Sequence, residues 1–376
     1  MEKRVLGQTG RVVSVLGLGG FHLLELSDKD AVRLMETFLD EGGDYMETAA
    51  QYGDGEAERK VGLVMERRRN ECFLASKCHF RTATEAAAGI DGSLRRLKTD
   101  YIDLLFLHHV QSNADLDLIL GPDGALEAFT RARDAGKIGH IGITGHGVPD
   151  VLIRALMEYE FDAVMTGFNF LDRFNFPRTE DELIPLARER GTGIVAMKVL
   201  GDGLLWEYPE QAIRYVLSLP VDVAAVGFNT IEMMMRDIGT ARDFRPMDEE
   251  EKEELFTNNP VLGNYVCRLC GACVPCPENI DIPEIFRYEG WFDRQLRDRV
   301  IRSAPDFALR DRVRFWFENM DRAREAYARL EIKADKCTRC GECVPRCPYG
   351  IDIIAKLEYA HYKLTRENVV TIPISG

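Results

Sequence analysis

Eight of the ten cysteines lie in the last third of the chain and form two nearly equal motifs, which constrain the fold more than any other feature. The second motif, CTRCGECVPRCP, spans residues 337–348. The first motif, CRLCGACVPCP, spans residues 267–277 and has one residue fewer before its last cysteine. Only Cys72 and Cys78 lie elsewhere. Clustered cysteines in a chain without export signals usually bind metal and do not form disulfides.

The second motif has the spacing that binds [4Fe–4S] clusters in bacterial ferredoxins. In that pattern three closely spaced thiolates bind one cluster, and the fourth cysteine, before a proline, binds the other cluster. Structural zinc is the alternative, but zinc sites usually pair two C-x₂-C units and lack this three-plus-one order. We therefore predict two clusters with crossed ligand sets. The first set is Cys267, Cys270, Cys273 and Cys347, and the second is Cys337, Cys340, Cys343 and Cys276.

The chain before these motifs alternates short apolar runs with amphipathic stretches. Helix-like stretches include 29–41, 56–67, 84–97 and 124–135, with glycine or aspartate at many of the joins. We interpret eight of the apolar runs as strands. Eight strands alternating with helices predict a (β/α)₈ barrel, and a doubly wound open sheet is the alternative. No G-x-G-x-x-G turn follows the first run, which favours the barrel. The predicted strands are 13–19, 45–47, 72–77, 102–108, 140–144, 163–167, 193–197 and 223–227.

The composition is that of an ordinary globular protein. Of the 376 residues, 45% are apolar and 29% are charged, which permits a large core. The net charge of −14 is unfavourable for binding a phosphate backbone. The opening segment MEKRVLGQTG has no apolar run of signal-peptide length, and no apolar stretch of about 18 residues occurs. We therefore expect a cytoplasmic protein with neither nucleic acid nor membrane as a partner.

The character of the sequence changes near residue 247. The acidic run at 247–255 predicts a solvated helix that leads into a second domain. Helical patterns at 286–298 and 308–330 lie around and between the cysteine motifs, so this domain should be mainly α-helical. We predict a barrel domain over 1–246 and a ferredoxin-like domain over 247–376.

Several motifs of the barrel region resemble those of the aldo-keto reductase family, in the same order. The segment Glu-Thr-Ala-Ala-Gln-Tyr-Gly at 47–53 is similar to the family signature D-T-A-x-x-Y-G. Further similar segments are LGQTG at 6–10, ASK at 75–77, YIDLLFLH at 101–108, GKIGHIGIT at 136–144 and FNFLDR at 168–173. The resemblance covers about residues 3–240. With the cysteine motifs, the whole chain resembles the subgroup of that family that carries a C-terminal ferredoxin-like domain.

The resemblance implies a catalytic role for four residues, all at the carboxyl ends of strands, where barrel active sites form. Tyr52 would donate a proton to a carbonyl that accepts a hydride. Lys77 would lower the pKa of that tyrosine, since a nearby cation favours the phenolate. His108 would orient the carbonyl oxygen, and Glu47 would pair with Lys77. Family members have aspartate where this chain has Glu47, so the carboxylate is displaced by about one methylene.

The cofactor side departs further from the family pattern. The residue that stacks on nicotinamide in the family is a tyrosine, and here it is Met197. The loop at 227–230, Gly-Phe-Asn-Thr, lacks the usual basic residue for the 2′-phosphate of NADPH. The family nevertheless implies NAD(P)H as a cofactor. The implied cofactor-binding residues are Asn169, Met197, Lys198, Gly227, Asn229 and Thr230.

Two redox chemistries meet in one chain. Nicotinamide transfers two electrons as hydride, whereas iron–sulfur clusters transfer one electron at a time, and a flavin usually joins the two. No flavin motif is evident, but a barrel can bind flavin phosphate without one, so flavin remains a candidate cofactor. Three hypotheses follow. In the first, the protein is an oxidoreductase that acts on a small carbonyl substrate, and its clusters relay electrons to or from a redox partner such as a ferredoxin. In the second, it is an electron-transfer subunit whose barrel is a docking scaffold, and in the third, it is a nicotinamide-dependent reductase with structural clusters.

Overall fold

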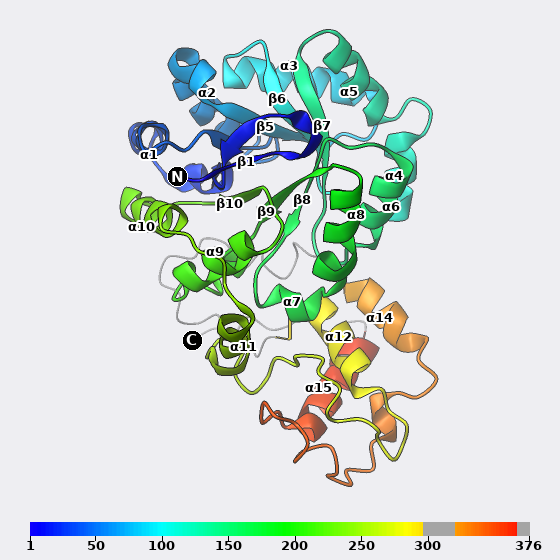
Figure 1. The fold of residues 1–376 in the computed structure, drawn as a ribbon. Coiled ribbons are helices and arrows are strands. Elements are labelled where there is room, and N and C mark those ends of the chain that lie inside the picture. Colours follow the sequence, from blue (N-terminus) through cyan, green and yellow to red (C-terminus); the bar gives the residue numbers. More distant parts are fainter. Residues whose placement is uncertain (296–319, 367–376) are drawn as a thin grey trace. The chain divides into compact units, whose positions relative to one another are not determined.

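The computed structural model describes residues 1–295 and 320–366 (Figure 1). The chain divides into two compact units. The first unit contains residues 1–169 and 178–248. The second contains residues 170–177 and the chain from residue 249 onward.

The first unit is a closed barrel of eight parallel strands with helices outside them, which confirms the predicted (β/α)₈ fold (Figure 1). Around the barrel the order is β10-β3-β4-β5-β6-β7-β8-β9, so each strand pairs with its neighbours in sequence and β10 pairs with β3 to close the ring. All carboxyl ends therefore lie at one end of the barrel. The strands are β3 (Leu16–Gly19), β4 (Tyr45–Glu47), β5 (Phe73–Cys78), β6 (Ile102–Leu107), β7 (Ile138–Thr144), β8 (Ala163–Gly167), β9 (Gly193–Met197) and β10 (Val223–Val226).

The barrel strands are buried on both faces. Every residue of β5 and β6 is buried, as expected for parallel strands covered by helices on one face and by the barrel core on the other. Large side chains such as Tyr45 and Phe106 belong to a buried cluster contributed by several strands. Gly17 of β3 makes room for this packing, since a Cβ atom there would lie 2.6 Å from the Tyr45 ring. The barrel interior is therefore a packed core, and a substrate can bind only at an end.

The first apolar run, predicted as one strand at 13–19, is divided in two. Residues Val12–Ser14 form β2, which pairs antiparallel with β1 (Lys3–Val5), whereas Leu16–Gly19 form β3 of the barrel. The Val15 N–H donates to the carbonyl of Glu2, at the edge of the hairpin, and not to a barrel strand. One apolar run thus contributes a strand to each of two different sheets. The composition of the run alone does not indicate this division.

Helices cover the outside of the barrel. The helix α1 shows why they form: Ser27 caps it by accepting from the Asp30 N–H at 3.2 Å, and Leu34, Met35 and Phe38 make its buried face. None of the helices in residues 1–295 and 320–366 is long and apolar enough to cross a membrane. The helices of this unit are α1 (Asp28–Asp40), α2 (Glu56–Arg68), α3 (Ala83–Leu97), α4 (Asn113–Leu120), α5 (Ala125–Asp134), α6 (Asp150–Glu158), α8 (Ile184–Glu189), α9 (Pro209–Ser218) and α10 (Ile231–Arg242).

The second unit is helical in its described part, as predicted. Its helices are α7 (Asp172–Asn175), α11 (Glu249–Asn258), α12 (Ile282–Asp293), α14 (Met320–Ala328) and α15 (Ile353–Thr365). The acidic run at 247–255 is therefore largely helical. Of the two helical patterns predicted at 286–298 and 308–330, the first coincides with α12 up to residue 293, and the second ends in α14. Residues 296–298 of the first pattern and 308–319 of the second lie outside the described residues.

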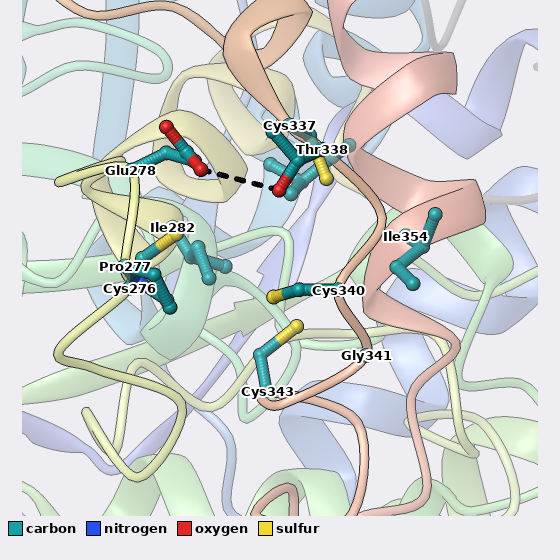
Figure 2. Close-up of a pocket in the computed structure, with 11 residues that line it drawn as sticks. Cys276, Pro277, Glu278, Ile282, Cys337, Thr338, Cys340, Gly341, Cys343 and Ile354 are labelled. Carbon is teal, nitrogen blue, oxygen red and sulfur yellow. Dashed lines mark hydrogen bonds between the residues drawn. The ribbon is translucent and has the colours of Figure 1, made fainter.

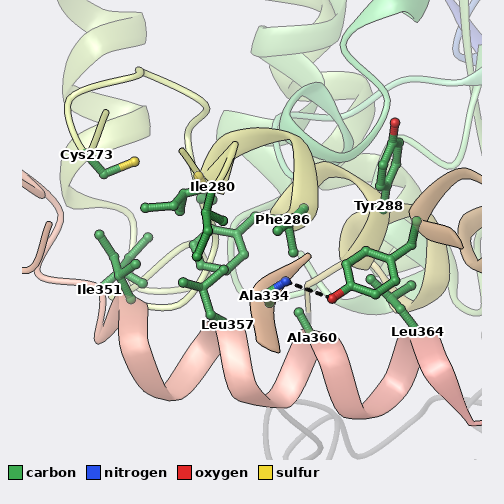
Figure 3. Packing of buried hydrophobic residues seen from close by; sticks show 14 of the residues in the cluster. Cys273, Ile280, Phe286, Tyr288, Ala334, Ile351, Leu357, Ala360 and Leu364 are labelled. Carbon is green, nitrogen blue, oxygen red and sulfur yellow. Dashed lines mark hydrogen bonds between the residues drawn. The ribbon is translucent and has the colours of Figure 1, made fainter. Parts of the chain in front are cut away.

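The core of the second unit lies between α12, α14 and α15. Apolar side chains such as Phe286, Leu357, Ala360 and Leu364 pack together there (Figure 3). The Ala334 N–H donates to the Tyr327 hydroxyl at 3.0 Å, which fixes the turn before the second cysteine motif to this core (Figure 3). Cys267, Cys273 and Cys343 belong to the same buried cluster, so the cysteine loops are built onto the core of this unit.

A buried ionic network joins α12 to α15. The Glu289 carboxylate lies 2.7 Å from the Lys356 ammonium and 2.9 Å from that of Lys363, and Lys363 also pairs with Asp293 at 2.5 Å. Tyr265 donates a further hydrogen bond to Glu289 at 2.8 Å. Burial opposes the ionisation of Glu289, but the two lysine cations outweigh it and hold the pKa of this carboxyl below its usual value.

Candidate functional site

Three of the predicted catalytic residues meet at the carboxyl ends of β4 and β5. Glu47 is the last residue of β4, and Lys77 lies near the end of β5, the strand that pairs with β4. The Lys77 ammonium contacts the Glu47 carboxylate directly. It also donates hydrogen bonds to the Thr48 carbonyl at 2.9 Å and to the Tyr52 hydroxyl at 3.1 Å. Lys77 is 1% exposed and Glu47 5%, so this ion pair is enclosed in protein.

The fourth predicted residue, His108, follows β6 directly. Its backbone N–H donates to the Cys78 carbonyl at 2.9 Å, which extends the β5–β6 pairing by one residue. The His108 ring centroid lies 5.9 Å from that of Tyr52 with the planes at 78°. Phe21 makes a similar edge contact with Tyr52 at 5.1 Å. The structure thus brings all four predicted catalytic residues together around Tyr52.

The six residues predicted to bind a nicotinamide cofactor lie at or just after the ends of β8, β9 and β10. Asn169 is fully buried, and its side-chain amide donates to the Lys198 carbonyl at 3.0 Å. The Lys198 ammonium pairs with Asp202 at 2.7 Å. Thr230 caps α10 by accepting from the Met233 N–H at 3.1 Å, a role that the fold alone requires.

A first hollow in the second unit is lined by four cysteines from both motifs. Cys267, Cys270 and Cys273 come from the first motif, and Cys347 is the last cysteine of the second. The other walls of the hollow include the side chains of Arg268, Phe286, Tyr349, Ile351 and Ile353.

A second hollow has the reciprocal composition. Cys337, Cys340 and Cys343 of the second motif line it together with Cys276, the last cysteine of the first motif (Figure 2). Its apolar walls include Ile282 and Leu357. The structure therefore brings together the same two sets of four cysteines that the crossed pattern predicts.

Each hollow fits a multi-atom metal cluster in its chemistry. Four thiolate donors surround a space with largely apolar walls, which is how proteins hold [4Fe–4S] clusters. Within residues 1–295 and 320–366, no three His, Cys, Asp or Glu side chains are placed to hold a single metal ion. The cysteines are thus distributed around the two hollows and do not converge on single points.

More than half of the chain, residues 15–216, matches the Aldo/keto reductase family. The chain belongs to this family. Residues 266–352 match a second family, described as a 4Fe-4S dicluster domain. The chain is therefore an oxidoreductase of the aldo-keto reductase type that carries a 4Fe–4S dicluster domain.

Several known proteins are similar to this chain over the barrel region. The uncharacterized oxidoreductase YqkF of Bacillus subtilis (strain 168) is 29% identical over 303 residues, which are 67% of this chain and 95% of the relative. A D-threo-aldose 1-dehydrogenase of Pseudomonas sp is 30% identical over 244 residues, 55% of this chain and 72% of the relative. Among solved structures, the holo form of the aldo-keto reductase AKR11C1 from Bacillus halodurans is 27% identical with a TM-score of 0.60, covering 68% of this chain and 95% of its own.

Burial dominates the electrostatics of this aldo-keto reductase site. It raises the pKa of Tyr52 above its usual value of 10, opposite to the direction that the resemblance implies. The reason is that burial removes the phenol from water, which disfavours its charged form. Burial, aided by the Lys198 cation, also lowers the pKa of Lys77. Burial and the Lys77 cation together lower the pKa of His108 well below 6.5, so this imidazole is neutral at pH 7.

Two residues of the aldo-keto reductase site, His22 and Asp202, are not predicted from the sequence. His22 follows β3, and its ring occupies the space where a side chain at Gly227 would lie, with a Cβ there 2.0 Å from the imidazole. Burial, with the Lys198 cation, lowers the pKa of His22 to about 4. Asp202 is 7% exposed, pairs with Lys198 and has a left-handed backbone with φ 56°. His22 could have been found as a polar residue just after the first barrel strand, whereas no sequence signal marks Asp202.

Proposed function

We propose that this protein interconverts a carbonyl compound and its alcohol at Tyr52, with electrons relayed through two [4Fe–4S] clusters to or from a redox partner protein such as a ferredoxin. The observation that carries the proposal is the pair of hollows, each lined by three cysteines of one motif and the last cysteine of the other. A family of hydride-transferring enzymes needs no such sites for its own chemistry. Their presence therefore favours one-electron chemistry in addition to the barrel reaction.

The barrel residues supply proton transfer and orientation. Reduction of a carbonyl to an alcohol consumes two electrons and two protons. Tyr52 donates one of the two protons, to the carbonyl oxygen, since its phenol is protonated through the physiological range. The second proton, which goes to the carbonyl carbon, comes from solvent. Neutral His108 can donate a hydrogen bond to the carbonyl oxygen. Lys77, held by Glu47, fixes the Tyr52 hydroxyl through the 3.1 Å hydrogen bond.

The clusters, when bound, would supply storage for two electrons, one in each cluster. Two electrons equal the requirement of one carbonyl reduction. Cys267, Cys270, Cys273 and Cys347 would hold one cluster, and Cys337, Cys340, Cys343 and Cys276 the other. The substrate remains defined only as a small molecule with a carbonyl or hydroxyl group.

A second candidate is a nicotinamide-dependent reductase whose clusters are structural. Its support is the similarity to relatives named as dehydrogenases, such as the D-threo-aldose 1-dehydrogenase. In this case Asn169, Met197, Lys198, Gly227, Asn229 and Thr230 would contact NAD(P)H. Against it stand Met197 in place of the stacking tyrosine and the loop at 227–230 without a basic residue.

The two candidates are distinguished by the electron donor. Full-length protein, prepared anaerobically, is assayed on a panel of aldehydes and ketones with reduced methyl viologen or with NADH and NADPH. We expect turnover with the one-electron donor, and slow or no turnover with nicotinamide unless flavin is added. Rapid turnover with NADH or NADPH alone would instead support the second candidate. If the clusters pass electrons to a partner protein but no carbonyl compound reacts, the protein is an electron-transfer subunit whose barrel is a docking scaffold.

A further inference from the structure

The two cysteine motifs have the same spacing in their first seven residues but differ in charge at the second position. Arg268 follows the first cysteine of the first motif, and Thr338 takes the same place in the second motif. Arg268 is 6% exposed, which is rare for an arginine, whereas Thr338 is exposed. The two hollows therefore differ in their electrostatic surroundings although their cysteine sets are equivalent.

Arg268 is held firmly against the first hollow. Its guanidinium donates to the Phe256 carbonyl at 3.1 Å and to the Leu262 carbonyl at 3.2 Å, and it contacts the Val266 carbonyl. It also lies 4.7 Å from the centre of the Tyr349 ring. All three hydrogen-bond acceptors are neutral carbonyls, so the positive charge is not cancelled by these partners.

This charge acts on the cysteines of the first hollow. Arg268 lines that hollow and interacts electrostatically with Cys267, Cys347 and Cys270, three of its four cysteines. Burial lowers the pKa of Arg268, but an arginine starts from a value above 12 and stays protonated. A fixed cation thus lies close to the cysteines of the first hollow, within the protein, where solvent screens it little.

The second hollow is lined by an acidic residue, whereas the first is lined by the basic residue Arg268. None of its lining residues is basic, and Glu278 is acidic. The Thr338 hydroxyl donates to the Glu278 carboxylate at 3.2 Å and keeps it beside Cys337 (Figure 2). Arg339 and Arg346 belong to the second motif, but each pairs with a glutamate of its own, and neither lines the hollow.

From this asymmetry we propose that Arg268 and Glu278 set the order in which the two clusters take up electrons. The cluster held by Cys267, Cys270, Cys273 and Cys347 has the higher reduction potential and is reduced first. The proposal rests on the proposed function only in requiring that both clusters bind. Reduction adds one electron, and so one negative charge, to a cluster; a buried cation stabilises that state and a carboxylate opposes it. No proton or further reactant is needed beyond a low-potential one-electron donor.

A second buried cation also lies near the first cluster site but does not decide the order. Lys356 is 2% exposed and interacts electrostatically with Cys267. Its charge is matched by Glu289 at 2.7 Å, so the pair has little net effect at a distance. Arg268, without such a partner among its hydrogen bonds, is the residue whose removal should change the potential most.

The test is an anaerobic redox titration of the full-length protein, followed by the electron paramagnetic resonance signals of the reduced clusters. Wild-type protein should show two one-electron steps. The variant Arg268→Gln should move the higher step to a more negative potential by at least a factor of ten in the reduction equilibrium, or about 59 mV. Arg268→Lys, which keeps the charge, should stay near wild type. Glu278→Gln, which keeps the acceptor for Thr338, should raise only the lower step.

The possible outcomes are distinct. The proposal is overturned if Arg268→Gln moves the lower step, or if Arg268→Lys shifts the potential as much as Arg268→Gln. If Arg268→Gln fails to retain its clusters, Glu278→Gln decides alone, and an unchanged or lowered second step overturns the proposal. Wild-type protein without any cluster signal after anaerobic preparation would instead overturn the proposed function itself, together with this inference.

Discussion

Glu47 shows how one residue can keep the charge of a family site and change its geometry. The resemblance places an aspartate here, yet the glutamate carboxylate still contacts the Lys77 ammonium directly. Lys77 retains its hydrogen bond of 3.1 Å to Tyr52. The additional methylene is therefore accommodated within the end of β4 and does not separate the pair.

Tyr52→Phe removes the hydroxyl that donates the proton and leaves the ring in place. We expect the rate of carbonyl reduction to fall by about 10²–10⁴-fold, the usual contribution of general acid catalysis. The iron and sulfide content should be unchanged, because Tyr52 lies in the barrel unit and the cysteines in the other. Steady-state assays with metal analysis check both points, and an unaltered rate would remove Tyr52 from the mechanism.

Glu47→Asp restores the family residue and tests whether the chain has adapted to glutamate. If the site works as the resemblance implies, the activity should remain within about threefold of wild type, since the charge next to Lys77 is kept. Glu47→Gln, which keeps the length and removes the charge, is the matched control and should lose far more. A loss with aspartate as large as that with glutamine would show that the longer side chain is itself required.

His22 gives a prediction for the dependence of stability on pH. Its pKa is lowered from 6.5 to about 4 in the folded protein, so the unfolded state binds more protons between these values. The contribution of His22 to stability is fully present above pH 6.5 and is lost as the pH falls toward 4, at up to about 1.4 kcal/mol per pH unit. Thermal unfolding of wild type and His22→Gln at pH 7 and pH 5 measures this. The variant should lose less stability on acidification, and equal losses would contradict the assignment.

At the scale of elements, each cysteine motif leads directly into a helix with the same start. The sequence I-D-I follows both motifs, and the two aspartates cap their helices. Asp281 accepts from the Glu284 N–H at 3.2 Å in α12, and Asp352 from the Ala355 N–H at 3.1 Å in α15. The repeat in this domain therefore includes the helices as well as the cysteines, and the two caps fix each cluster loop to a core helix.

Much of the barrel could be predicted from the sequence because each strand is a short apolar run that is buried on both faces. The runs at 45–47, 163–167 and 193–197 coincide with β4, β8 and β9. What could not be predicted depends on contacts between distant residues. The ring of His22 fills the space beside Gly227, and the buried pairing of Lys198 with Asp202 needs left-handed backbone at both. The domain boundary between 246 and 247 stays a prediction.

The ionic network between α12 and α15 should be essential for the second unit. Glu289→Gln would leave Lys356 and Lys363 without their shared carboxylate in a fully buried site. Removing one partner of a buried ion pair typically costs about 3–5 kcal/mol. Thermal unfolding of the anaerobic protein should show this loss. Asp321→Asn, at an exposed pair with Arg324, is the control and should change stability by less than about 1 kcal/mol.

In the whole molecule, an aldo-keto reductase barrel shares one chain with a 4Fe–4S dicluster domain. Each unit has its own hydrophobic core, so each unit can hold the side chains of its own site in place without the other. The iron content and the electron path are therefore the properties by which the whole protein is best tested.

Protein purified anaerobically should contain about eight iron and eight sulfide ions per chain, four of each per cluster. Replacing Cys340 by serine should remove up to half of this iron and leave the first cluster in place, since Cys340 lines only the second hollow. Chemical iron and sulfide determination provides the measurement. Stoichiometric zinc without labile sulfide would contradict the cluster assignment.

A single-turnover experiment with pre-reduced clusters tests whether electrons reach the barrel substrate from the clusters. The clusters are reduced by a one-electron donor, the donor is removed, a carbonyl substrate is added, and the visible absorbance of the clusters is followed together with product. We predict that the clusters reoxidise and that one alcohol forms for every two electrons released, whereas in Tyr52→Phe they stay reduced. Clusters that remain reduced in the wild-type protein, while NADH or NADPH supports turnover of the same substrate, would contradict electron transfer between the clusters and the barrel substrate.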